Sequence, residues 1–152
     1  MLLINKADYL TDELREHWSK YFKEMNVNHV FFSALLEQEK IDKHTDIEDE
    51  VKEEEDGEDS GEELVNKEEE KKQLDDEAKA ALANINSPHI FNRAELLSLL
   101  GFKARLEGRT PDERLMVGMV GYPNVGKSSV INVLCGRKRV GVASMPGKTK
   151  HF

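Results

Sequence analysis

The sequence contains few of the features that mark secreted, disulfide-bonded or membrane proteins. It has one cysteine in 152 residues, so no internal disulfide can form. It has no run of 18 apolar residues, which excludes a transmembrane helix. The N-terminal stretch lacks a basic region and reaches Lys6 and Asp8 too early for a signal peptide. These absences favour a reducing compartment and no membrane partner.

Large apolar residues are also scarce in one strongly acidic segment, residues 42–77. It holds 19 acidic and 5 basic residues, a net charge of −14, whereas the other residues carry 11 acidic and 17 basic ones, a net charge of +6. Such a segment buries too little surface to offset its ordering entropy, so we expect a largely disordered acidic linker over residues 37–89. The basic remainder of the chain suits polyphosphate or nucleic acid.

Strand and helix patterns alternate in the first 36 residues. The apolar run MLLI predicts a buried strand, and residues 11–25 predict a helix capped by Thr11. Residues 27–34 predict a second strand followed by a turn. One apolar stripe of the helix recurs at spacings of three and four and is expected in the core: Leu14, Trp18, Tyr21, Phe22 and Met25.

The same alternation returns after the linker. Asn92, with Glu95 three residues on, predicts a capped helix. Residues 114–122 predict a strand, and residues 126–136 predict a helix that ends at Gly136. Strands that alternate with helices indicate an α/β domain with a parallel sheet. The core side of the capped helix is expected to hold Leu96, Leu99 and Leu100.

The pattern G-x-x-x-x-G-K-[ST] stands between this predicted strand and helix, at residues 121–128. Glycines there allow backbone N–H groups to face phosphate oxygens, and the helix N-terminus adds further donors. Lys127 would reach the β- and γ-phosphates, and Ser128 would ligate Mg²⁺. A solvated glycine turn is the alternative. The predicted phosphate site comprises Asn124, Val125, Gly126, Lys127, Ser128 and Ser129.

A second motif, NKAD, follows the first predicted strand and indicates which base is bound. The Asp8 carboxylate can accept hydrogen bonds from both N1–H and the 2-amino group of guanine. Adenine would leave this acceptor unpaired, at a cost of about 1–3 kcal/mol or more. Asn5 is expected to brace the loop, and the Lys6 stem to lie over the base. A backbone N–H at Ser33 and Ala34 could donate to guanine O6. The motif therefore predicts GTP or GDP.

Together these motifs resemble those of the Ras-like GTPases. NKAD is similar to the fourth GTPase motif, FFSAL to the fifth, GYPNVGKSS to the first and MPGKTKHF to the second. The order fourth, fifth, first, second is that of the circularly permuted GTPases. The resemblance implies a Ras-like P-loop NTPase fold whose acidic insert bridges the original termini. Lys127 would supply charge stabilisation in catalysis, and Thr149 would ligate Mg²⁺ beside Ser128. Asn124 matches an asparagine associated with K⁺, although a turn asparagine is an equally good interpretation.

The resemblance also implies a cellular role. Most permuted members act in ribosome assembly. The W-x-x-Y-F helix and the acidic insert are most similar to the members that act in cytoplasmic maturation of the large ribosomal subunit and release its nuclear export adaptor. The implied partners are rRNA and proteins of that subunit and the export adaptor, and a cytoplasmic monomer is expected. The HSR1-like permuted GTPases, which also carry an acidic insert, are the alternative.

One GTPase element has no counterpart, because D-x-P-G does not occur in the sequence. The resemblance also implies a missing strand before NKAD, and hence an incomplete sheet with a gap beside the strand that leads into the phosphate loop. We expect the 152 residues to be a fragment of a larger GTPase. Its expected parts are a base-recognition half (1–36), the linker (37–89) and a phosphate-loop half (90–152). Weak guanine-nucleotide binding without hydrolysis, or a binding module that acts through the acidic arm, stays open as an alternative.

Overall fold

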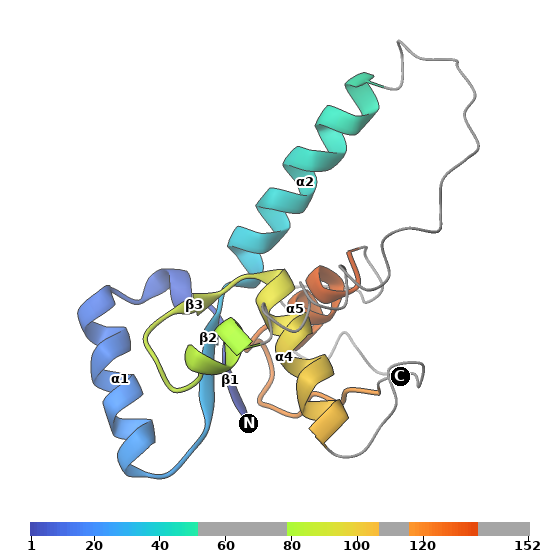
Figure 1. Cartoon of the computed structure of the whole chain (residues 1–152). Helices are drawn as coiled ribbons and strands as arrows, with labels where there is room; N and C mark the ends of the chain where they lie inside the picture. Colours follow the sequence, from blue (N-terminus) through green and yellow to red (C-terminus); the bar gives the residue numbers. More distant parts are fainter. Residues whose placement is uncertain (52–78, 107–115, 137–152) are drawn as a thin grey trace.

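Three short parallel strands form the centre of the fold in the computed structural model, which describes residues 1–51, 79–106 and 116–136 (Figure 1). Their order in the sheet is β1 (Leu2–Ile4), β2 (His29–Phe32) and β3 (Ile90–Phe91). Both pairs of neighbouring strands are parallel. The first two strands confirm the strands predicted within residues 1–4 and 27–34, but β1 is exposed or half-buried and not buried as expected. Strand β3 was not predicted.

Helices connect and cover these strands. A 3₁₀ helix, η1, follows β1, and the α-helices begin where the sequence supplies caps. The Thr11 hydroxyl accepts from Leu14 N at 3.4 Å, and Asn92 and Glu95 exchange the two hydrogen bonds of a capping box at 2.8 and 2.9 Å. Both predicted caps are therefore confirmed. The bounds are η1 (Ala7–Tyr9), α1 (Asp12–Glu24), α2 (Ala34–Val51), α4 (Arg93–Leu106) and α5 (Lys127–Leu134).

The core lies between the sheet and the pair of helices α4 and α5. All four residues of β2 are buried. Since side chains alternate along a strand, Val30 and Phe32 face this core, while His29 and Phe31 face the other side, where the Phe22 ring of α1 lies 5.3 Å from the His29 ring. Figure 1 shows α1 on one side of the strands and α4 and α5 on the other. The buried cluster comprises Val30, Phe32, Ala34, Ala81, Phe91, Leu96, Leu99, Val130 and Val133.

The prediction that the aromatic stripe of α1 lies in the core is wrong for most of its members. Trp18 and Tyr21 remain 41% and 45% exposed, and Leu14 and Met25 are also exposed. The buried residue of α1 is Ser19, whose hydroxyl donates to Asn86 O at 2.8 Å. The contact between α1 and the rest of the fold therefore includes buried polar groups. Its rings pack on one another, and no described residue covers them enough to bury them.

The boundaries of the acidic linker also differ from the prediction. The turn expected after β2 is instead the start of α2, which continues to Val51 and so includes the first ten residues of the acidic segment. Residues 79–83 are helical, and Ala81 is fully buried in the core. Local helix propensity and one small apolar residue that faces the core account for this order. The rest of the predicted disordered segment, residues 52–78, lies outside the described residues.

The strand predicted over residues 114–122 does not form in its described part, residues 116–122. Met116 is 88% exposed, and the Val120 side chain is fully exposed. A strand needs a neighbour to pair its N–H and C=O groups. Among the described strands, β1 is the edge strand on this side, and a cleft separates it from the segment. The predicted gap in the sheet stays a prediction, because the segment forms no strand that could lie on its far side.

No helix within the described ranges is both long and apolar enough to cross a membrane.

Candidate functional site

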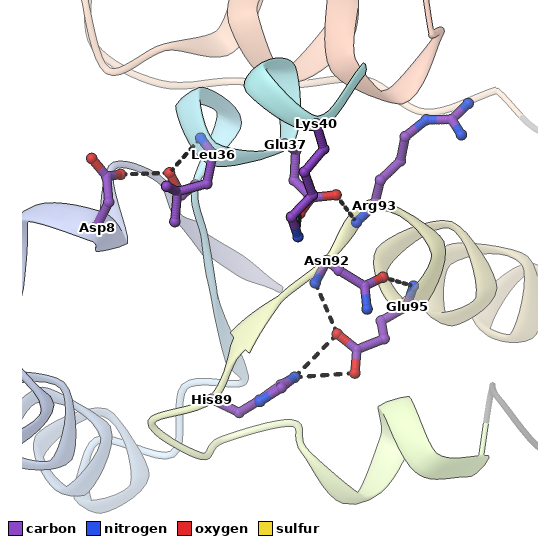
Figure 2. Close-up of polar contacts among 9 residues, drawn as sticks. Asp8, Leu36, Glu37, Lys40, His89, Asn92, Arg93 and Glu95 are labelled. Carbon is purple, nitrogen blue, oxygen red and sulfur yellow. Dashed lines mark hydrogen bonds and ion pairs between the residues drawn. The ribbon is translucent and has the colours of Figure 1, made fainter. Parts of the chain in front are cut away.

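The NKAD residues lie directly after β1, where the chain turns into η1. Lys6 has a left-handed backbone, with φ 62°, and its side chain is exposed. The Asp8 carboxylate accepts a hydrogen bond from the Ser33 hydroxyl at 2.6 Å, and the same hydroxyl oxygen accepts from Leu36 N at 3.3 Å. Figure 2 shows this path from Asp8 to the first turn of α2. The carboxylate is thus fixed by the end of the neighbouring strand, as two parallel strands allow.

The phosphate-loop residues form a turn that ends in α5. Asn124 and Gly126 both have positive φ, 61° and 96°, and Gly126 is the N-cap of α5. The left-handed Asn124 fits the interpretation as a turn asparagine. The Lys127 ammonium donates to the carbonyl oxygens of Gly121 and Tyr122, each at 2.7 Å. The loop therefore curls around the lysine head, with Ser128 and Ser129 half-buried in the first turn of the helix.

Asn5 joins the two motifs across 120 residues of sequence. Its Nδ2 donates to Val125 O at 3.0 Å, and its Oδ1 accepts from Ala34 N at 3.1 Å. One side-chain amide of the NKAD segment thus contacts the other two segments that the sequence analysis assigned to nucleotide binding. The approach is so close that a Cβ atom at Gly126 would lie 2.1 Å from Asn5 Nδ2. Both the left-handed φ and this contact require glycine at position 126.

A cleft of about 530 Å³ lies where the motifs meet. Residues of both motifs line it, together with positions that no motif indicated. Gln38 and Asp42 come from α2, and their place in the cleft wall could not be read from the sequence because only the fold turns them toward the NKAD loop. The predicted site residues in its wall are Asn5, Lys6, Asp8, Ala34, Gly126 and Ser129.

A larger cleft of about 730 Å³ lies between β1 and the segment that leads into the phosphate loop. Its walls are mostly apolar and include Leu3, Leu96 and Val130. Asn5, Lys6, Asn124 and Lys127 of the two motifs also line it, but Asp8, Ala34 and Ser129 line only the smaller cleft. We therefore take the 530 Å³ cleft, where Asp8 lies, as the candidate nucleotide site, and the phosphate-loop wall of the larger cleft adjoins it.

The sequence predicts two Mg²⁺ ligands, of which the structure describes one. Ser128 lies at the start of α5, whereas Thr149 lies outside the described residues. No group of three or more His, Cys, Asp or Glu side chains that could hold a metal occurs in the described part of the chain. A Mg²⁺ ion at Ser128 would therefore take most of its ligands from nucleotide phosphates and water, as is usual for this ion.

Known proteins match the chain along its whole length. Large subunit GTPase 1 of Schizosaccharomyces pombe is 40% identical over 99% of the chain, and the protein of the same name from Saccharomyces cerevisiae is 36% identical over all of it. The Large subunit GTPase 1 homolog of Drosophila melanogaster is also 36% identical over the full chain. These proteins are homologues of the chain. The chain covers 22% of the length of each yeast relative and 28% of the fly relative, so it corresponds to a part of longer proteins, as predicted.

The profile of the 50S ribosome-binding GTPase family matches residues 116–152. The match includes the phosphate loop and α5, so this part of the chain is similar in sequence to that GTPase family. It also includes residues 137–152, which lie outside the described ranges. Thr149, which was predicted as a Mg²⁺ ligand, therefore falls within the matched sequence. No solved structure gives a significant match to the fold.

Proposed function

We propose that the chain forms the guanine-nucleotide-binding part of a circularly permuted P-loop GTPase. The single observation that supports this best is the double hydrogen bond of Asn5, to Val125 O and from Ala34 N. A phosphate loop and a base-reading loop must lie one nucleotide length apart to hold the same ligand. Here one side chain ties them together, although the phosphate loop comes late in the chain and the base-reading motif comes first.

In this proposal each motif contacts one end of the nucleotide. The Asp8 carboxylate accepts from guanine N1–H and the 2-amino group, while Ser33 holds it in place and the Lys6 stem covers the ring. Backbone N–H groups from Val125 to Ser129, at the positive end of α5, receive the phosphates.

Lys127 and the proposed metal ligands act at the phosphate end of the nucleotide. On arrival of nucleotide the Lys127 ammonium leaves the carbonyls of Gly121 and Tyr122 for the β- and γ-phosphates. Mg²⁺ at Ser128 and Thr149, and K⁺ at Asn124, are part of the proposal, and Mg²⁺ supplies charge neutralisation when bound. Hydrolysis would require groups that sense the γ-phosphate and that these motifs do not include. We therefore propose GTP hydrolysis only for a protein in which such groups complete the site.

The cellular part of the proposal comes from the relatives. They are named Large subunit GTPase 1, and the matching family is described as ribosome-binding. We accordingly propose a role in maturation of the large ribosomal subunit in the cytoplasm, with rRNA, ribosomal proteins and the export adaptor as partners of a monomer. The HSR1-like GTPases, and a chain that binds guanine nucleotide weakly without hydrolysis, remain the alternatives.

Titration with fluorescent GDP and ATP analogues tests the base assignment. GDP should bind at least about 100-fold more tightly than ATP, and Asp8→Asn should weaken GDP binding about 10- to 100-fold, because the substituted amide cannot accept both guanine hydrogen bonds. Asp12→Asn is the matched control, since Asp12 is an exposed carboxylate on α1 that lines neither cleft, and its change should leave GDP affinity unaltered. A preference for ATP would overturn the proposal.

A further inference from the structure

The C-terminal end of α5 is held by an arginine from another helix. Arg93, the first residue of α4, donates through Nε to Val133 O at 2.9 Å and through Nη2 to Leu134 O at 3.2 Å. The last carbonyl groups of a helix have no partner within the helix, and a positive charge beside them interacts favourably with the helix dipole. The planar guanidinium suits this position because it offers several donors in a fixed geometry.

Gly136 provides the space for this contact. Its φ of 62° turns the chain away at the end of α5, and a Cβ atom there would lie 3.3 Å from Arg93 Nη2. Gly136 N also donates to Val133 O at 3.0 Å, so this carbonyl oxygen accepts hydrogen bonds from both Gly136 N and the Arg93 side chain. The end of α5 is thus closed by its own glycine turn and by Arg93 together.

A buried carboxylate holds Arg93 in turn. Glu37 of α2 is only 7% exposed, and its Oε2 accepts from the backbone N–H of Arg93 at 2.7 Å. Its Oε1 accepts from Lys40 at 2.6 Å. Figure 2 shows Glu37 and Lys40 meeting the start of α4, while the Arg93 side chain extends away from them. The carboxylate therefore caps the N-terminus of α4, where its charge is favourable.

From these contacts we infer that Arg93 is a positioning residue for the phosphate site. α5 has eight residues, so it is a rod about 12 Å long with Lys127 and Ser128 at one end and the Arg93 contacts at the other. Such a short helix makes few hydrogen bonds of its own, so its direction depends on contacts with the rest of the fold: Val130 and Val133 pack in the core, and other residues hold its two ends. Asn5 fixes the loop at the N-terminal end, and Arg93 fixes the C-terminal end.

The same contacts connect the base site with the phosphate site. Ser33 and Ala34 contact Asp8 and Asn5, and Glu37 follows one turn later in α2. From Glu37 the path continues through Arg93 to α5. Arg93 thus orients the phosphate-binding groups without touching the nucleotide. This inference rests on the proposed function.

Its test compares two ligands that use different parts of the site. In the full chain, GDP affinity is measured by titration with a fluorescent analogue, and guanosine affinity is measured by NMR. Arg93→Ala should weaken GDP binding about tenfold and leave guanosine binding within about twofold, because only the phosphate-binding groups move. Arg93→Lys keeps the charge but not the fork, and should lose about two- to fourfold for GDP.

Arg15→Ala is the matched control. The Arg15 guanidinium also donates to two backbone carbonyls, of Pro88 at 3.0 Å and Leu10 at 2.6 Å, but it lies on α1, away from α5. Its loss should leave the ratio of GDP to guanosine affinity unchanged. If Arg93→Ala lowers both affinities equally, or matches Arg15→Ala, the inference is overturned while the proposed function stands. A wild-type chain that binds no GDP overturns both. If Arg93→Ala does not fold cooperatively in thermal unfolding, Arg93→Lys decides by the same ratio.

Discussion

The two nucleotide motifs of this chain stand after apolar runs of similar character, yet the structure treats those runs differently. The run before NKAD forms β1, which pairs with β2 along its whole length. The run before the phosphate loop, Val117–Val120, forms no strand, and Val120 is fully exposed. An apolar run becomes a strand only where a neighbour can satisfy its backbone, so the difference between the motifs is a difference in neighbours.

The loops themselves differ much less than the runs that lead to them. Asp8 is held by Ser33, while the phosphate loop is held by Asn5 and by the carbonyl contacts of Lys127. Each loop is thus shaped mainly by its own hydrogen bonds, and less by the run that leads into it. The phosphate loop keeps its turn and its helix because α5 is buried against the core through Val130 and Val133. A local loop geometry therefore does not require a complete sheet.

The largest effect is expected from breaking the contact between the loops. Gly126→Val should lower GDP affinity by more than about 100-fold, because a Cβ atom would displace Asn5 and the residue would have to keep φ at 96°. Titration with fluorescent GDP measures it. Gly118→Val is the control, since nothing lies within 4 Å of a Cβ atom there. Equal losses from both variants would contradict the role of this contact.

A smaller effect is expected when half of the Asn5 bridge is removed. Asn5→Asp keeps an oxygen to accept from Ala34 N but sets a second oxygen against Val125 O, so GDP affinity should fall about tenfold. The change can be followed in the same titration. Asn92→Asp, the same substitution at a helix cap, should leave the affinity unchanged, because aspartate also caps helices. An unaltered affinity in Asn5→Asp would show that the loops are held without this bridge.

The smallest effect is expected in the run that pairs with none of the described strands. Val120→Ala should change the free energy of unfolding by less than about 0.5 kcal/mol, as at other exposed sites. Val30→Ala, in the paired and buried β2, should cost about 1–3 kcal/mol through lost burial and a cavity. Urea denaturation without nucleotide compares the two. Equal costs would mean that Val120 is packed in solution, and the contrast between the two runs would be lost.

Much of the site could be predicted because its motifs carry their own geometry. A left-handed Gly126, a helix that starts at Lys127 and a carboxylate after an apolar strand follow from local residue types. The caps at Thr11 and Asn92 were predictable for the same reason. The lining residues from α2, and the contacts of Glu37 and Arg93, were not, because a single charged residue on a helix carries no sign of its distant partner.

The errors share one physical cause. The stripe of α1 and the run before the phosphate loop both have the pattern of buried elements, and in the structure most of their large apolar residues are exposed. Periodicity shows which face is apolar and not whether another element covers it. The ends of the predicted linker differ in the opposite direction, since Ala81 is small, stands in a polar context of helix-forming composition and is nevertheless buried in a helical stretch.

By itself, the sequence determined the α/β alternation, the two nucleotide motifs and the relation to longer GTPases. All three depend on residues close together in the chain or on direct similarity. Only the tertiary structure decided that Asn5 joins the motifs, that Arg93 closes the far end of α5, and that one predicted strand does not form in its described part. Those outcomes depend on which side chains contact which backbone groups across 40 to 120 residues of chain. Residue type alone does not specify such contacts.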